Sequence, residues 1–186
     1  MKIVVTVGCS FLGVLAGIYA GNRFFYQAPR QDYVAPNPLD SISVTLVPGD
    51  SFPPETYTDT AGKVGNFRDL LLGKNSLVVF ANLYCEPCHD FLRLFQKHLR
   101  HQLQKKAQVI VCLSTHQRPV PEEYQGLMAG CELIFYDDAT WSDKYRMRFW
   151  PSLIVVDQYG FVNHVQLGYD GYIDYELFDY IFFRGV

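Results

Sequence analysis

The stretch SLVVFANLYCEPC, residues 76–88, joins a strand pattern to two cysteines that are separated by two residues. Its first part, Ser76–Asn82, is a continuous apolar run, which is typical of a strand buried on both faces of a sheet. After the second cysteine the apolar spacing changes to that of a helix. Apolar residues recur there at intervals of three and four: Leu92, Phe95, Leu99 and Leu103. We therefore expect a strand that leads directly into a helix, with Cys85 and Cys88 at the junction.

Segments on both sides of this stretch alternate between strand and helix patterns. The further expected strands are Ser43–Val47, Val109–Leu113, Leu133–Tyr136, Leu153–Val156 and Phe161–Gln166. The expected helices are Phe67–Leu72, Glu122–Ala129, Trp141–Met147 and an aromatic-rich segment, Tyr172–Phe183, whose rings should cover the sheet. The last two strands are joined at Asp157–Gly160 and predict an antiparallel hairpin. Together these segments predict an α/β fold with helices on both faces of the sheet.

The first 40 residues differ from the rest of the chain. No charged residue occurs from Ile3 to Asn22, and a helix of that length matches the roughly 30 Å hydrocarbon core of a bilayer. We expect residues 1–22 to form a transmembrane anchor, with a signal peptide cleaved near Ala20 as the alternative. Residues 23–40 are rich in Pro, Asn and Gln and predict a linker. The globular domain is expected over residues 41–186.

Charges near the apolar segment bear on its orientation. Lys2 and the amino terminus favour a short tail in the cytoplasm, whereas Arg23 and Arg30 weakly favour the reverse. Anchors with so few residues before the apolar segment normally insert with their N-terminus in the cytoplasm. We therefore expect the domain on the extracytoplasmic, periplasmic side of the cytoplasmic membrane.

Composition excludes several classes of protein. The chain has 16 Lys and Arg against 19 Asp and Glu, a net charge of −3, and no basic run. A nucleic-acid partner is therefore not expected, because such binding depends on clustered basic residues. Five cysteines in 186 residues are also too few for a disulfide scaffold.

The cysteine pair lies where a helix is expected to begin. Backbone N–H groups at a helix N-terminus stabilise a thiolate, which is the reactive form of cysteine. Pro87 suits this turn because the first turn leaves its own N–H groups unpaired. The pattern indicates thiol–disulfide chemistry, in which Cys85 is the exposed nucleophile and Cys88 the more buried thiol that resolves a mixed disulfide.

Other segments fit one family together with the cysteine pair. These are Ala61-Gly62-Lys63 with Asp69-Leu70, Tyr145 six residues before Pro151, and the apolar strand from Pro151-Ser152 to Asp157-x-x-Gly160. Over residues 50–185 the chain resembles the membrane-anchored thioredoxin-like oxidoreductases of the TlpA/ResA type. The tetrapeptide CEPC is also found in the cytochrome c maturation branch. The resemblance implies a thioredoxin-like fold, a redox-active disulfide Cys85–Cys88, and no metal or other cofactor.

The same resemblance gives Pro151 the place of the family's cis proline. It implies that Pro151 faces the disulfide, turns the backbone of Trp150 toward a substrate strand, and keeps a metal from using both thiols. The alternative is an ordinary proline at the start of a strand. Trp150 departs from the family, which usually has a small or aliphatic residue there, and it is expected to narrow the substrate groove.

Acidic residues near the thiols also depart from the family. Val79 stands where thioredoxins have a buried acid, and Phe91 where the maturation branch often has Glu. Glu86 and Asp90 are left, and they either relay protons or favour the helix N-terminus electrostatically.

These acids bear on the redox direction. Negative charge beside Cys85 opposes a stable thiolate, which a strongly oxidising couple requires. We therefore expect a reductant of disulfides in client proteins, recharged by a membrane thiol–disulfide electron donor.

Two other functions use the same residues. CEPCH, residues 85–89, is also the attachment motif for c-type haem, with His89 as the proximal ligand and Met128 or Met147 as the distal one. The strand before the motif argues against haem, because small c-type cytochromes are mainly helical.

A copper module is the second alternative, and it would use both thiols with a histidine such as His164. Copper-delivery relatives of the fold normally space their cysteines one residue wider, and His164 is expected to be a half-exposed strand residue. Of the other cysteines, Cys112 is expected to be an inert core thiol, with a Cys112–Cys131 pair as the alternative.

Overall fold

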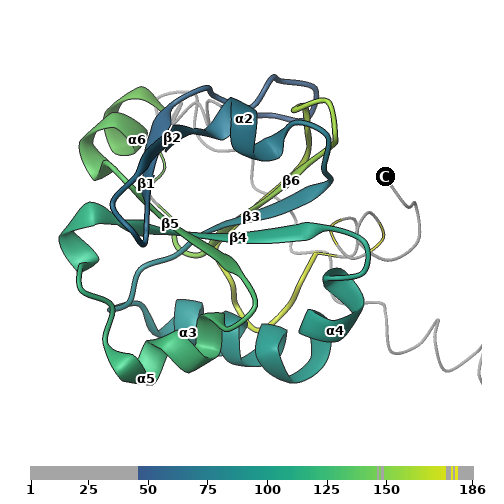
Figure 1. Cartoon of the computed structure of the whole chain (residues 1–186). Helices are drawn as coiled ribbons and strands as arrows, with labels where there is room; N and C mark the ends of the chain where they lie inside the picture. The colour runs from purple at the N-terminus through teal and green to yellow at the C-terminus, as the bar shows by residue number, and fades with distance from the viewer. Residues whose placement is uncertain (1–45, 146, 148, 175–176, 178, 180–186) are drawn as a thin grey trace, which may run out of the picture. The chain divides into compact units, whose positions relative to one another are not determined.

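The computed structural model describes residues 46–145, 147, 149–174, 177 and 179, all within the unit Ile42–Val186. The strands are β1 (Thr56–Asp59), β2 (Val64–Asn66), β3 (Ser76–Phe80), β4 (Gln108–Ser114), β5 (Glu132–Tyr136), β6 (Ser152–Val156) and β7 (Val162–Leu167). They form a sheet in the order β2-β1-β5-β4-β3-β6-β7 (Figure 1). β3, β4 and β5 are parallel, whereas β6 runs antiparallel to β3 and β7 antiparallel to β6. The expected α/β fold, with its mixed sheet and its hairpin, is confirmed.

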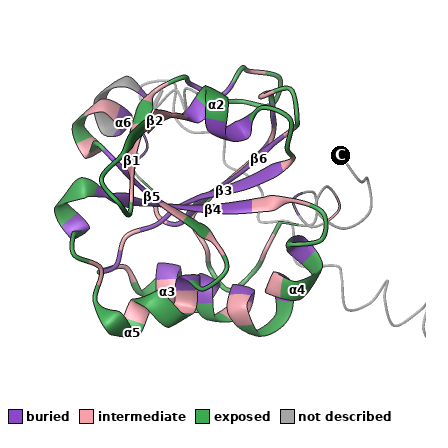
Figure 2. Ribbon diagram, in the orientation of Figure 1, coloured by how far each residue is buried: buried purple, intermediate pink, exposed green. Residues whose placement is uncertain are grey.

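The central strands explain the continuous apolar runs. Every residue of β3 is buried, and so is β4 after its first residue (Figure 2). Leu77 and Val79 face one apolar cluster, while Val78 and Phe80 face a second cluster on the other side of the sheet. Because both faces are covered, neither face of β3 needs polar residues.

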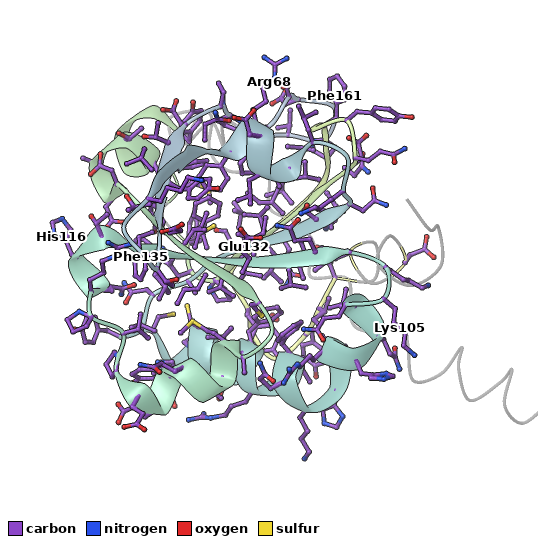
Figure 3. The ribbon with its side chains drawn as sticks, viewed as in Figure 1. Arg68, Lys105, His116, Glu132, Phe135 and Phe161 are labelled. Carbon is purple, nitrogen blue, oxygen red and sulfur yellow. The ribbon has the colours of Figure 1, made fainter. Side chains whose placement is uncertain are left out.

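Helices cover both faces of the sheet. The helices are α2 (Phe67–Leu71), α3 (Glu86–Leu94), α4 (Arg100–Leu103), α5 (Glu122–Gln125) and α6 (Asp138–Lys144). α2 and α6 lie on one face, and α3, α4 and α5 lie on the other (Figure 1), with side chains filling the space between each layer and the sheet (Figure 3). A π-helical turn, Phe95–Leu99, joins α3 to α4. Its position leaves the four apolar residues of the expected helix buried: Leu92, Phe95, Leu99 and Leu103.

The hairpin of β1 and β2 was missing from the sequence prediction, and its turn falls at Ala61-Gly62-Lys63. Asp59 Oδ1 accepts the N–H groups of Ala61 at 2.9 Å and Lys63 at 2.8 Å, and Gly62 has a φ of 88°. Such a left-handed residue favours glycine. The two strands are short and no residue in them is buried. They therefore carry no apolar alternation that could have predicted them.

The expected strand Ser43–Val47 is wrong where it can be checked. Leu46 and Val47 are described and neither is in a strand, while residues 43–45 lie outside the described part. The Val47 N–H instead binds Asp50 Oδ2 at 3.0 Å, in a turn that brings Gly49 N to 2.7 Å from Val162 O. Leu46 is nevertheless buried in the core.

Three expected helices have different bounds. The expected helix Glu122–Ala129 ends at Gln125, and a 3-10 turn, Gly126–Met128, follows it. α6 begins three residues earlier than predicted because Asp137 caps it, accepting Thr140 N at 3.1 Å. Residues 172–174 are not helical, and Tyr172 is 78% exposed, so the prediction that its ring covers the sheet is wrong. The side chain of Gln166 holds this segment in place by bonding Tyr172 O and Asp174 N. Leu177 and Asp179 are helical, and the remaining residues of the expected helix lie outside the description.

The expected anchor (1–22) and linker (23–40) also lie outside the described residues. Among the helices that are described, none combines the length and apolar character needed to cross a membrane.

Candidate active site

The two cysteines lie at the junction of β3 and α3. Cys85 is the N-cap residue of α3, directly before its first helical residue, and Pro87 stands in the first turn. Cys85 is half-buried, whereas Cys88 lies within α3 and is fully buried in the core. One thiol is therefore accessible to a partner and the other is shielded by the core.

The surroundings of Cys88 favour its protonated form. Burial raises the pKa of the Cys88 thiol, and a hydrogen bond with Cys85 raises it further. The N–H of Asn82 donates to Cys88 Sγ at 3.4 Å and acts in the opposite direction. Val79 and Phe91 are both buried and apolar, and they belong to the same cluster as Cys88. Asn82 therefore supplies the hydrogen bond that favours a Cys88 thiolate.

Cys85 faces the backbone of Trp150. The Cys85 thiol donates to Trp150 O at 3.5 Å, and the Trp150–Pro151 bond is cis, as the resemblance implied. Trp150 is half-buried, and its indole N–H donates to the hydroxyl of Tyr136 at 3.4 Å. Burial raises the pKa of that hydroxyl, so Tyr136 stays neutral. Two hydrogen bonds thus fix Trp150 beside the exposed thiol.

Glu86 and Asp90 are both exposed. Asp90 pairs with Arg93 at 3.0 Å on the outer side of α3. Among the described residues, neither carboxylate hydrogen-bonds to a cysteine. The geometry favours the electrostatic role of these acids over a proton relay.

His89 is committed to the protein backbone. A ring nitrogen lies 2.6 Å from Leu83 O, and the ring contacts Tyr124 at a centroid distance of 4.8 Å. Met128 and Met147 belong to apolar clusters on opposite faces of the sheet. The site therefore favours a thiol pair over a haem held by His89 and one of these methionines.

The copper alternative also finds no support among the described residues, which contain no group of three or more His, Cys, Asp or Glu able to hold a metal ion. His164 is buried at 7% exposure, so the expectation of a half-exposed residue is wrong. It lies 3.6 Å from Asp174, in the segment after β7. Cys112 and Cys131 belong to clusters on opposite faces of the sheet, which argues against a pair between them.

Two further residues of the site, Asn82 and Gln117, are not predicted by the sequence pattern. Asn82 lies in the loop before Cys85, and Gln117 ends a short 3-10 turn after β4, Thr115–Gln117. His116 in that turn is exposed and points outward at the edge of the fold (Figure 3), but Gln117 is buried and donates to Asn82 Oδ1 at 2.7 Å. The two residues are 35 positions apart. No local pattern could have predicted that they meet.

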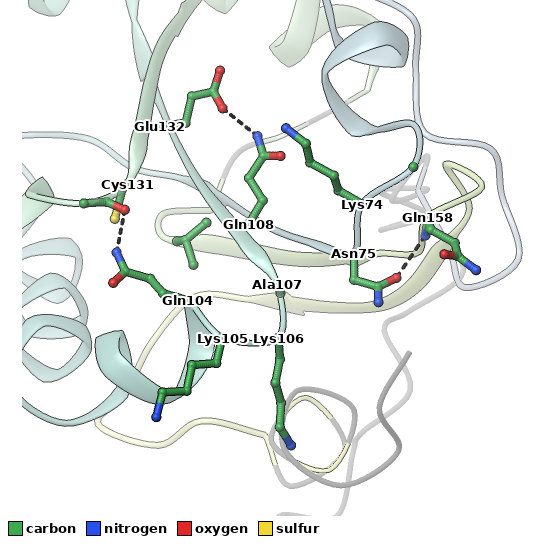
Figure 4. Close-up of a pocket in the computed structure, with 13 residues that line it drawn as sticks. Lys74, Asn75, Gln104, Lys105, Lys106, Ala107, Gln108, Cys131, Glu132 and Gln158 are labelled. Carbon is green, nitrogen blue, oxygen red and sulfur yellow. Dashed lines mark hydrogen bonds between the residues drawn. The ribbon is translucent and has the colours of Figure 1, made fainter.

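A hollow of 820 Å³ lies at the opposite end of the sheet (Figure 4). It lies where β3, β4 and β5 begin, whereas the cysteines follow the end of β3. Three hydrogen bonds link polar groups around it: Gln108 to Glu132 at 2.6 Å, Gln104 to Gly130 O at 2.6 Å, and Gln158 N to Asn75 at 3.0 Å. We assign no chemistry to this hollow.

Comparison with known proteins supports the fold. No family model and no curated protein matches the chain. Solved structures do match it, among them the thioredoxin domain of a thiol-disulfide oxidoreductase from Bacteroides vulgatus, at 19% identity and a TM-score of 0.54, over 72% of this chain and 94% of that one. A thiol:disulfide interchange protein from Bacteroides sp. matches at 18% identity and a TM-score of 0.55, over 66% and 82%. Reduced Prx3 from Vibrio vulnificus, in complex with H2O2, matches at 13% identity and a TM-score of 0.57, over 72% and 96%. At these identities the likeness shows the fold, and the thioredoxin-like architecture that the resemblance implied is confirmed.

Proposed function

We propose that this chain is a thiol–disulfide oxidoreductase that reduces disulfides of client proteins outside the cytoplasm. The observation that carries the proposal is the asymmetric pair at the start of α3, with Cys85 half-exposed and Cys88 buried. Thiol-disulfide oxidoreductases among the matching structures support it. Prx3, which is in complex with H2O2, also matches this chain, so the fold alone does not identify the activity. The proposed activity therefore depends on the residues of this chain.

The proposed reaction has two exchange steps. The Cys85 thiolate attacks a client disulfide, so that a Cys85–client bond forms, the client disulfide breaks, and one client sulfur leaves as a thiolate that takes up a proton. Cys88 then loses its proton and attacks Cys85 Sγ, which forms the Cys85–Cys88 disulfide and releases the second client thiol. Two electrons and two protons pass to the client in total. A membrane dithiol donor returns them to this chain.

The charges and burial around the pair support the reductive direction. A low thiol pKa stabilises the reduced form and makes a couple more oxidising. Here burial raises the pKa of Cys88, and Glu86 places negative charge in the first turn of α3. Both effects oppose a stable thiolate, and a couple with these properties donates electrons more readily than it accepts them.

Trp150 and Pro151 shape the proposed client site. Trp150 O already accepts a hydrogen bond from the Cys85 thiol, which places this backbone beside the reactive sulfur. We infer that a client strand lies along this backbone during exchange, and that the indole of Trp150 limits how bulky the client can be at that point.

The proposed location is the extracytoplasmic face of the cytoplasmic membrane, with residues 1–22 as the anchor and 23–40 as the linker. The uncharged run from Ile3 to Asn22 supports the anchor. Client proteins in cytochrome c maturation fit the tetrapeptide CEPC, and other proteins with a disulfide to be reduced fit the same site.

The test is the thiol–disulfide midpoint potential of the purified full chain in detergent. We expect a reversible two-electron couple that is lost in Cys85→Ser and in Cys88→Ser and kept in Cys112→Ser, because Cys112 is buried on the other face of the sheet. Cys88→Ser should also accumulate a mixed disulfide with a model client, since the resolving thiol is gone. A couple near −120 mV, typical of strong periplasmic oxidants, would contradict the reductive direction. The absence of any couple, with a haem spectrum or tight copper binding, would overturn the proposal.

A further inference from the structure

We propose that Asn82 and Gln117 form a positioning pair that aligns the Asn82 N–H with Cys88 Sγ and thereby tunes the reduction potential of the Cys85–Cys88 couple. This inference rests on the proposed function. It assigns a role to two residues that the cysteine motif does not contain.

Asn82 bonds to both sides of the cysteine loop. Its N–H donates to Cys88 Sγ at 3.4 Å, and its carbonyl accepts the Cys85 N–H at 3.1 Å. Its side-chain Oδ1 accepts the Tyr84 N–H at 2.8 Å and the Gln117 amide at 2.7 Å. A rotation of Asn82 therefore disturbs contacts to Tyr84, Cys85 and Cys88 together.

Gln117 is itself held from both directions. Before it, Ser114 Oγ accepts the His116 N–H at 3.2 Å and caps the 3-10 turn. After it, the guanidinium of Arg118 lies 3.8 Å from the ring centroid of Phe135 and bonds to the carbonyls of Thr58 and Asp59. The residues on both sides of Gln117 are thus held to strands β4, β1 and β5. Gln117 can hold Asn82 in place because its own position does not depend on the cysteine loop.

The two loops are also neighbours through the sheet. β3 pairs with β4 up to Phe80 and Cys112, and the next N–H along, that of Ala81, donates to Cys112 O at 3.0 Å. This contact extends the sheet to the residue before Asn82. The pairing of β3 with β4 therefore sets the distance between Asn82 and Gln117.

The bonding of Gln117 indicates a role beyond stability. Gln117 is 7% exposed, and its Oε1 has no hydrogen-bond partner among the described residues. A buried acceptor without a partner costs stability, and an apolar side chain of similar shape would avoid that cost. What methionine cannot supply here is the Nε2 donor that reaches Asn82. Gln117 therefore acts through its Nε2 donor, which binds Asn82 Oδ1.

The direction of the effect follows from the reduced state. In the reduced form Cys88 keeps its proton and hydrogen-bonds to Cys85. An N–H donor at Cys88 Sγ polarises this thiol and strengthens that bond, whereas the disulfide has no such bond to strengthen. Misalignment of the Asn82 N–H should therefore destabilise the reduced form and make the couple more reducing. It should also raise the pKa of Cys88, which slows the step in which Cys88 resolves the mixed disulfide and moves the pH profile of that step to higher pH.

The experiment compares Gln117→Met, Asn82→Ala and the double variant with wild type, using the full chain in detergent. Readouts are the midpoint potential and the pH profile of the rate at which Cys88 resolves a mixed disulfide on Cys85, followed by release of the client thiol. We expect Gln117→Met to shift the dithiol–disulfide equilibrium constant about tenfold toward the disulfide, as the loss of one aligned hydrogen bond allows. This corresponds to roughly 30 mV for a two-electron couple. The double variant should match Asn82→Ala, because residues that act as one unit are not additive.

The matched control is Gln104→Met, which removes another amide donor, bonded to Gly130 O at 2.6 Å at the far end of the sheet. It should leave the potential and the pH profile of the resolving step unchanged. A wild-type couple that neither Gln117→Met nor Asn82→Ala alters would overturn the inference, as would an equal shift in Gln104→Met. If Gln117→Met does not fold, a folded Asn82→Ala with a wild-type potential overturns it alone. The absence of a couple in wild type would instead overturn the proposed function.

Discussion

Tyr84, the residue before Cys85, is 88% exposed. A large aromatic ring that stays exposed beside a reactive sulfur is available to a partner, and aromatic anchors often dominate binding. We expect Tyr84→Ser to lower kcat/KM for a protein disulfide by about fivefold to tenfold, the effect of losing a modest aromatic contact. Reduction of a small-molecule disulfide and the midpoint potential should not change, because neither depends on a client surface. Stopped-flow kinetics with both substrates measures the difference.

Tyr159 offers a matched control for this prediction. It is 69% exposed and follows β6, whose end pairs with the beginning of β3, so it lies far from the cysteines. Tyr159→Ser should keep wild-type kinetics with both substrates. If the two variants lose activity equally, Tyr84 has no special contact with the client.

At the residue scale, what the sequence predicts depends on how local the signal is. Cys85, Pro87 and Cys88 lie within four residues. The change from a continuous apolar run to apolar residues at intervals of three and four places them at the start of a helix. Asn82 and Gln117 meet only because β3 and β4 pair, and His164 is buried where a half-exposed strand residue was expected. Such long-range contacts leave no periodic trace in the sequence.

At the element scale, α2 begins with a capping arrangement that can be tested without changing the cysteine pair. Asn66 Oδ1 accepts the Asp69 N–H at 2.8 Å, and Asn66 Nδ2 donates to the Asp69 carboxylate at 2.7 Å. We expect Asn66→Ala to lower the free energy of unfolding by about 1 kcal/mol, because it leaves an N-terminal N–H without its cap. Urea unfolding followed by circular dichroism measures this change.

Serine serves as the conservative variant at this position. Asn66→Ser keeps a side-chain oxygen that caps nearly as well as asparagine, so it should recover most of the lost stability. Equal destabilisation by Ala and Ser would mean that the capping bond contributes little. The potential of the cysteine pair should stay the same in both variants, since α2 covers the opposite face of the sheet from α3 (Figure 1).

Elements were predictable in proportion to how much of their surface is buried. β3, β4 and the helix after the cysteines were found because burial on one or both faces imposes an apolar pattern. The hairpin of β1 and β2 has no buried residue and was missed. The expected helix Tyr172–Phe183 begins too early, because a high aromatic content does not by itself locate the first residue of a helix. Its first three residues are instead held outside any helix by the side chain of Gln166.

At the scale of the whole molecule, buried thiols couple stability to pH. Burial raises the pKa of Cys88 and Cys112, and it raises that of Cys131 to about 12. Below the pKa of an unfolded thiol, about 8.5, both states keep their protons and the stabilisation is fully present. Above it the unfolded chain loses protons that the folded chain retains. The free energy of unfolding should therefore fall as the pH rises from about 8.5 toward 12.

The redox state of the pair provides the control for this prediction. Each buried thiol contributes a slope of about 1.4 kcal/mol per pH unit in that window. A disulfide does not titrate, so the oxidised protein should lose stability less steeply than the reduced protein. Urea unfolding at pH 7, 8, 9 and 10 in both states measures the two slopes. Equal slopes would mean that Cys88 does not retain its proton in the folded state.

The proposed location can be tested by labelling a thiol, because Cys85 is half-exposed while Cys112 is fully buried. In a bacterial host that expresses the full chain, the protein should sediment with membranes and resist extraction by high salt, which releases charge-bound proteins but not a transmembrane helix. A membrane-impermeant maleimide should label reduced Cys85 in intact spheroplasts, since the domain is expected outside the cytoplasm. Cys85→Ser identifies the signal that belongs to this thiol, and lysed cells give its maximum. Labelling that requires lysis would place the domain inside, where a cysteine pair of this kind would meet the cytoplasmic thiol pool instead of extracytoplasmic clients.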